Sequence, residues 1–160
     1  MRRFRHSATT HQQILSGFAE RNQIMTSSNA KTLFISHAWT RNQPQWKQVV
    51  DWLEQEADFP WENCSHPDAE TLPDRSSRTL SAEMSRQIAS AQAVIILSEL
   101  YAANSEWLDY EIDEAKRMHK FIIGVAPLNQ GSVPRKIRES ADLVVGGSSA
   151  SVVGTVRYLV

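Results

Sequence analysis

The sequence predicts an α/β domain in which a mainly parallel sheet of about five strands is covered by helices on both faces. Short apolar runs of strand length, above all residues 93–98 and 121–125, alternate with longer segments whose apolar residues recur at helical spacing. These two runs show no alternation of polar and apolar residues, which is typical of parallel strands buried on both faces. The chain has 160 residues, 41% of them hydrophobic, and this fits one domain with its own core.

The first strand and the first helix are predicted from residues 32–57. Residues 32–36 (TLFIS) are apolar and partly β-branched, as in a short buried strand. Pro44 suits the first turn of a helix, where no backbone N–H is needed. The expected apolar face of this helix comprises Trp46, Val49, Val50, Leu53 and Ala57.

Residues 59–91 combine irregular and helical patterns. The segment 59–65 predicts an irregular strand or a loop, because Pro60 and Pro67 disturb regular pairing. Residues 66–79 are polar and predict a long exposed loop. A second helix follows, with Thr79 or Ser81 as its N-cap. Its apolar positions are Leu80, Met84, Ile88 and Ala91.

The second half of the chain repeats the alternation. After the strand over 93–98, a helix is expected from about residue 104 to 119, with Asn104 or Ser105 as its cap. The remaining elements are a strand over 121–125, a short helix over 133–139, a strand over 142–145 and a closing helix over 150–160.

Residues 1–30 differ in composition from the domain that we expect over residues 31–160. They contain Arg2, Arg3, Arg5 and Arg21 but only one acid, and they are rich in polar residues. We interpret them as a poorly ordered extension. A targeting segment is the alternative interpretation, and Met25 is a conceivable downstream start.

The composition of the chain argues against several classes of function, namely binding to nucleic acid, membrane association and metal binding. The formal net charge of −1 predicts no partnership with nucleic acid or with an anionic membrane, and no apolar run approaches the length of a membrane span. Cys64 is the one cysteine, so no internal disulfide is expected and a cytoplasmic location is predicted. The histidines lack the spacing of metal ligands, and no Gly-rich phosphate loop is present.

The most informative residue is Glu111, because it falls on the apolar side of its predicted helix. At about 100° per residue, it lies within the arc formed by Trp107, Leu108, Ile112 and Ala115. A carboxylate on this side either finds partners or has a raised pKa, and such groups are candidates for catalysis. The alternative is a carboxylate at the helix rim that pairs with an arginine.

Polar and aromatic side chains follow two of the predicted strands. Ser36, His37 and Trp39 follow the first strand, while Ser98 and Tyr101 follow the strand that leads into the Glu111 helix. Ligands of open α/β sheets bind beyond the carboxyl ends of the strands, so these side chains are expected to converge. Taken singly, Ser36 could be a turn residue and His37 a surface residue.

Several segments resemble the TIR-like proteins of Thoeris antiphage defence systems. These are residues 33–39 (LFISHAW), 59–67 (FPWENCSHP), the block from Val94 through Tyr101 and Trp107 to Glu111, and 120–125 (KFIIGV). The resemblance covers about residues 31–160, and it implies a flavodoxin-like, three-layer fold. Cys64 stands where that family usually has an aromatic residue, and residues 1–30 have no counterpart.

The resemblance implies an activity. TIR-type enzymes cleave the nicotinamide–ribose bond of NAD with a glutamate four residues after a tryptophan, which here are Glu111 and Trp107. Ser36, His37 and Trp39 would line the same pocket, together with Ser98 and Tyr101. NAD would be the substrate, and neither a metal nor a separate cofactor is expected.

Three hypotheses follow. The first is an enzyme that converts NAD to ADP-ribose or to a cyclic ADP-ribose-type signal. This signal would act on a separate effector, and the active form of the enzyme could be a homo-oligomer. The second is a TIR-like scaffold or interaction module without turnover. The third is a flavodoxin-like receiver or nucleotide-binding domain, although the strand ends carry no cluster of aspartates for phosphoryl transfer.

Overall fold

The structure is a computed structural model that describes residues 29–40, 43–66, 69 and 72–160. The chain divides between Ala30 and Lys31, and the fold given below is that of the unit Lys31–Val160. Except for residues 29 and 30, the predictions for the N-terminal extension lie outside the described residues, as does Met25.

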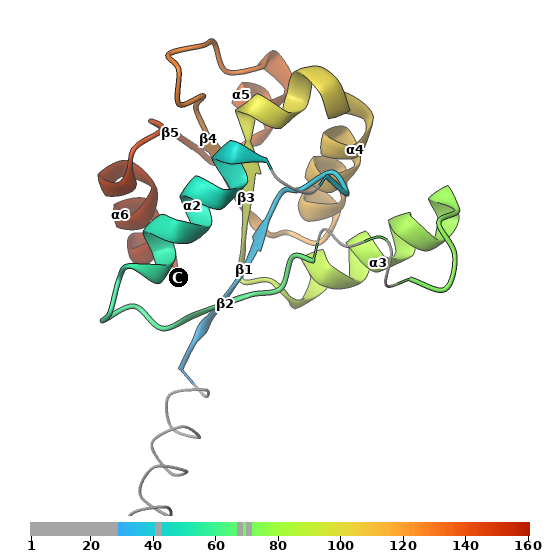
Figure 1. Cartoon of the computed structure of the whole chain (residues 1–160), viewed down its shortest axis with the longest axis horizontal. Coiled ribbons are helices and arrows are strands. Elements are labelled where there is room, and N and C mark those ends of the chain that lie inside the picture. The colour runs from blue at the N-terminus through green and yellow to red at the C-terminus, as the bar shows by residue number, and fades with distance from the viewer. Residues whose placement is uncertain (1–28, 41–42, 67–68, 70–71) are drawn as a thin grey trace, which may run out of the picture. The chain divides into compact units, whose positions relative to one another are not determined.

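A sheet of five parallel strands forms the centre of this unit (Figure 1). The strands are β1 (Lys31–Ile35), β2 (Trp61–Asn63), β3 (Ala93–Leu97), β4 (Phe121–Val125) and β5 (Leu143–Val145). Their order is β2-β1-β3-β4-β5, and every neighbouring pair is parallel. This order is that of flavodoxin-like folds, so the predicted fold class is confirmed.

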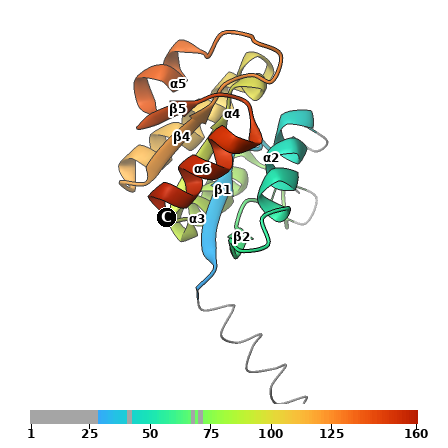
Figure 2. The same cartoon turned by 90° about the vertical axis from the view of Figure 1, so that its left-hand side faces the viewer.

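Five helices cover the two faces of the sheet. They are α2 (Pro44–Glu54), α3 (Ser77–Ser90), α4 (Ser98–Arg117), α5 (Arg135–Ser140) and α6 (Ser149–Leu159). Helices α2 and α6 pack together on one face, while α3, α4 and α5 lie on the other (Figures 1 and 2). The arrangement is the three-layer α/β architecture that alternating strands and helices predict.

The core follows the apolar runs of the sequence. All side chains of β3 are fully buried, as are Leu33, Phe34 and Ile35 of β1. Cys64 is half-buried, and its thiol donates to the carbonyl oxygens of Leu33 and Gln87. Within the described residues, no helix is both long enough and apolar enough to cross a bilayer.

The end of α2 and the start of α3 differ from the prediction, and α5 and α6 are each displaced by one or two residues. Helix α2 ends at Glu54, so Ala57 lies beyond it. Helix α3 begins at Ser77, a turn earlier than expected, because the Ser76 side chain caps it by accepting a hydrogen bond from the Thr79 N–H at 3.2 Å. The predicted caps at Thr79 and Ser81 are therefore wrong. The first turn is polar because it faces solvent, and apolar periodicity does not detect such a turn.

Helix α4 also begins earlier than the sequence indicates. It starts at Ser98, directly after β3, whereas the predicted start at residue 104 is a kink. Asn104 has non-helical backbone angles (φ −139°, ψ 31°), and its side-chain amide donates to the Leu100 carbonyl at 3.2 Å. The helix predicted from residue 104 therefore corresponds to the part of α4 after the kink, and the turn from Ser98 to the kink was not predicted.

Candidate functional site at the carboxyl ends of β1 and β3

The site lies where the connections of the sheet diverge. From β1 the chain crosses to β2 on one side, while β3 leads to β4 on the other side. Such a switch point is where ligands bind in open α/β sheets. Ser36 follows β1 here, and its hydroxyl oxygen accepts a hydrogen bond from the Leu97 N–H at the end of β3, at 2.8 Å. Ser36 therefore ties the two strand ends together.

A tight turn follows β1. Ala38 and Trp39 have φ values of 47° and 56°, in the left-handed region that non-glycine residues seldom adopt. The turn is closed by a hydrogen bond from the Thr40 N–H to the His37 carbonyl at 2.8 Å. Conformations of this kind cost about 1–3 kcal/mol per residue, and the surrounding contacts must offset that cost.

Glu111 contacts the backbone of this turn directly. Its Oε1 accepts hydrogen bonds from the backbone N–H groups of His37, at 3.3 Å, and Ala38, at 3.1 Å. The side chain is completely buried, and Oε2 has no partner. Burial raises the pKa of Glu111 to about 8, against the opposing effect of the two N–H donors. The helical-wheel prediction of an inward carboxylate is therefore confirmed.

His37 is a neutral imidazole that holds the turn from inside. Its Nδ1 accepts from the Trp39 N–H at 3.0 Å, so the ring proton lies on Nε2, which donates to Gln87 Oε1 at 3.1 Å. The ring is fully buried rather than at the surface. Burial lowers the pKa of His37 to about 4, and the hydrogen bond with Gln87 opposes this shift only in part.

Aromatic rings extend the site toward α4. The rings of His37 and Trp39 lie 5.0 Å apart between centroids, and those of Trp39 and Trp107 lie 6.4 Å apart at an angle of 82°. Trp107 precedes Glu111 by about one helical turn. The structure thus brings together Ser36, His37, Trp39, Trp107 and Glu111.

The two remaining predicted residues have different surroundings. Ser98 is the first residue of α4, and its buried hydroxyl has no hydrogen-bond partner. The Tyr101 hydroxyl donates to Asp109 Oδ1 at 2.9 Å. Asp109 lies two residues before Glu111 and therefore on a different side of the helix. The Tyr101 hydroxyl is engaged away from the Glu111 carboxylate.

Unpartnered polar atoms gather in the elements that meet at this edge. Among the described residues, four buried side-chain atoms lack hydrogen-bond partners: Trp39 Nε1, Trp46 Nε1, Ser98 Oγ and Glu111 Oε2. Trp39 and Ser98 follow the two strands, Trp46 lies in the first turn of α2, and Glu111 lies on α4. Buried polar groups are normally paired, so this set indicates a place for a polar ligand.

Sequence reasoning missed two buried glutamines that brace the site. Gln87 accepts from His37 Nε2 and from the His66 N–H at 3.0 Å. Gln45 accepts from the Glu99 N–H at 3.0 Å and donates to the Ala126 carbonyl at 2.8 Å. Each shares a helix face with apolar residues, as Glu111 does, so the same wheel argument could have found them.

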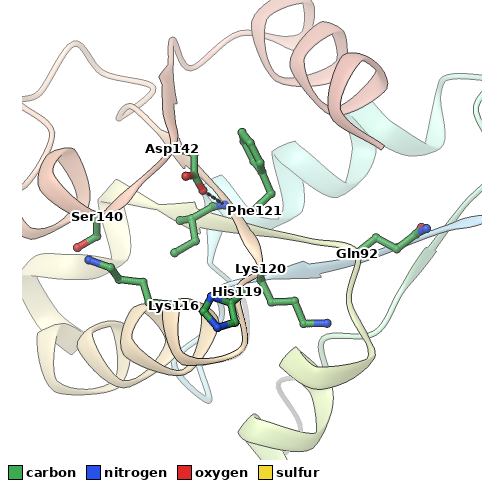
Figure 3. A pocket seen from close by; sticks show the side chains of 8 residues that line it. Gln92, Lys116, His119, Lys120, Phe121, Ser140 and Asp142 are labelled. Atoms are coloured by element: carbon green, nitrogen blue, oxygen red, sulfur yellow. Dashed lines mark hydrogen bonds between the residues drawn. The ribbon is translucent and has the colours of Figure 1, made fainter.

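A cavity of about 490 Å³ lies at the opposite edge of the sheet (Figure 3). Its lining includes Lys116, His119 and Lys120, close to the ends of α3 and α4. The Lys120 ammonium donates to the carbonyl oxygens of Ala89 and Ala91, both at 2.7 Å. Lys116 and Lys120 complement the negative C-terminal ends of the helices, so we assign these two lysines a structural role. In the described part of the chain, no group of three potential ligands is arranged to hold a metal ion.

Comparisons with known proteins agree with this architecture. The family model of the TIR-like domain of Thoeris protein ThsB matches residues 34–132, which include Ser36, Trp107 and Glu111. The structure of CMP N-glycosidase BcmB from Clostridium botulinum is similar in fold, with a TM-score of 0.50 and 15% sequence identity. The similarity covers 81% of this chain and 100% of that chain. No curated protein matches the sequence.

Proposed function

The chain belongs to the family of the TIR-like domain of Thoeris protein ThsB, and on that premise we propose that it cleaves the nicotinamide–ribose bond of NAD. The observation that carries the proposal is the buried Glu111 carboxyl at the switch point of the sheet, with one oxygen held by two backbone N–H groups and the other unpartnered. Trp107, one turn away, supplies an aromatic surface beside it.

The chemistry requires an anion beside the ribose. When the bond between the ribose carbon and the pyridinium nitrogen breaks, its electron pair leaves with nicotinamide and positive charge develops on the ribose ring. A fixed carboxylate stabilises this charge and orients the ribose hydroxyls. Water then attacks the ribose carbon to give ADP-ribose and a proton. Attack by a nucleophile of the same molecule gives a cyclic ADP-ribose-type product and a proton instead.

For this step Glu111 must be ionised, and its carboxylate must be in contact with the ribose. With a pKa of about 8 it is mostly protonated at neutral pH, and it is completely buried. The positive charge of the nicotinamide ring favours the carboxylate form, because an opposite charge nearby lowers the pKa of an acid. Contact with the ribose also requires the completely buried carboxyl to become accessible.

The structural neighbour supports this class of chemistry. It is described as a CMP N-glycosidase, an enzyme that acts on the N-glycosidic bond of a nucleotide, and it has a similar fold. For the present chain, we propose that the product is a diffusible nucleotide signal that activates a separate effector in antiphage defence. Self-association into a homo-oligomer and a cytoplasmic location form part of the same proposal.

The enclosure of Glu111 favours a second candidate function. In the described structure its carboxylate is completely buried, as in a binding or scaffold module that does not turn over substrate. A nicotinamide-release assay separates the two. Concentrated protein is incubated with NAD, with and without lysate of phage-infected cells, and nicotinamide is followed by chromatography. The enzymatic proposal predicts release in at least one condition, whereas its absence in both supports the scaffold.

A further inference from the structure

A second cavity lies between α3 and α4, and Trp107 is part of its lining. It has a volume of about 230 Å³. The residues that line it are Ser77 and Ser81 from α3 and Glu106, Trp107 and Tyr110 from α4. Complete small-molecule sites usually measure about 300–1,000 Å³, so this cavity suits one ring system rather than a whole dinucleotide.

Its aromatic walls are held in place by their neighbours. Trp107 lies at 82° to both Trp39 and Tyr110, with centroid separations of 6.4 and 6.1 Å. The Tyr110 hydroxyl lies 2.7 Å from Ser85 Oγ and donates to the Ser81 carbonyl at 2.9 Å. These contacts fix the orientation of both rings, and a flat ring can stack on them.

The polar groups of the cavity select what such a ring carries. Glu106 is exposed and, when ionised, can only accept hydrogen bonds. The hydroxyls of Ser77 and Ser81 can either donate or accept. A carboxylate beside an aromatic wall matches a ring that bears an N–H₂ group, and it does not match a ring that presents acceptors alone.

We propose that this cavity binds a heteroaromatic ring of the nucleotide substrate that carries an N–H₂ group. Trp107 is the stacking surface for the ring, and Glu106 accepts a hydrogen bond from the N–H₂ group. The inference rests on the proposed function, since it places the ring one helical turn from Glu111 and so brings the attached ribose toward that carboxyl. Adenine presents such an N–H₂ group as its exocyclic amine, and nicotinamide presents one in its carboxamide.

Ligand titrations followed by NMR test the assignment without any turnover. The probes are nicotinamide against methyl nicotinate, and adenosine against purine riboside, where the second member of each pair lacks the N–H₂ group. The readout is the indole N–H resonance of Trp107, which the Trp107→Phe variant identifies. We expect at least one amino-bearing probe to shift this resonance and to bind at least fivefold more tightly than its partner.

Variants on α4 supply the controls. Glu106→Leu should abolish the preference for the amino-bearing probe, and Glu106→Gln, which keeps an acceptor oxygen, should retain part of it. Asp113→Asn removes a carboxylate of the same helix outside the cavity and should change nothing. The proposal is overturned if no probe shifts the Trp107 resonance, if paired probes bind equally, or if Glu106→Leu leaves the preference intact.

The same titrations separate this inference from the proposed function. Amino-selective binding at Trp107 without any nicotinamide release would support the cavity assignment and count against the enzyme. Nicotinamide release without such binding would support the enzyme and overturn the assignment. The pair of probes that responds identifies which end of the dinucleotide the cavity takes.

Discussion

Two buried titratable residues, Glu111 and His37, make opposite contributions to the pH dependence of stability. Burial raises the pKa of Glu111 from 4.5 to about 8, so the folded protein holds a proton that the unfolded chain has released. The free energy of unfolding therefore falls, as far as Glu111 is concerned, when the pH rises from 4.5 to about 8. Burial lowers the pKa of His37 from 6.5 to about 4, so its contribution is lost as the pH falls through that range.

Glu111→Gln should remove the first contribution and leave the second. Relative to wild type, the stability of the variant should increase by about 1.4 kcal/mol for each pH unit between pH 4.5 and 8. Above pH 6.5 the wild type should lose stability while the variant does not. Urea denaturation across this range measures both curves. Parallel curves would show that no titrating carboxyl is buried at this position.

Gln87 gives a second prediction at the scale of the residue. Gln87→Met should destabilise the protein by about 1–3 kcal/mol, because the His37 Nε2–H and the His66 N–H both lose their acceptor. Gln87→Glu keeps an acceptor and adds a negative charge, so it should raise the pKa of His37. Denaturation measures the first effect, and ¹⁵N NMR of the imidazole measures the second. An unchanged His37 pKa in Gln87→Glu would argue against the contact.

Among the secondary-structure elements, the strands follow from the sequence more closely than the helices. The observed β4 has the predicted bounds, and β1 and β3 differ from prediction only at their ends. Buried parallel strands are apolar along their whole length, so composition alone marks them. The start of α3 is misplaced because its first turn is polar and faces solvent. The predicted start of α4 coincides with its kink at Asn104, and the part before the kink was missed because it continues directly from β3.

The N-cap of α3 provides a test at this scale. Ser76→Ala should lower stability by about 1 kcal/mol, because the Thr79 N–H loses its acceptor. Ser77→Ala, one residue later in the same exposed turn, is the matched control and should have a much smaller effect. Equal losses in the two variants would mean that Ser76 does not cap the helix.

The candidate site was only partly predictable for a similar reason. The inward position of Glu111 follows from the apolar neighbours on its helix. Its partners do not, because the N–H groups of His37 and Ala38 reach it only through a left-handed turn at two non-glycine residues. Sequence preference argues against such a turn, and tertiary contacts determine it.

For the molecule as a whole, the carboxyl ends and the amino ends of the parallel strands carry different groups. The carboxyl ends of β1 and β3 carry the strained turn and the unpartnered polar atoms. The amino ends carry lysines that complement the C-terminal ends of helices. The strand order places the switch point of the sheet at the same carboxyl ends.

In the proposed reaction, the Glu111 carboxylate acts directly on the ribose of NAD. The most direct measurement is the rate at which Glu111→Gln releases nicotinamide under the conditions where the wild type is active, using protein whose cooperative unfolding confirms its fold. Loss of a charge that stabilises the transition state should lower this rate by about 100-fold or more, while Asp113→Asn stays near the wild-type rate. A folded Glu111→Gln protein that releases nicotinamide as fast as the wild type would show that this carboxylate does not take part in the cleavage.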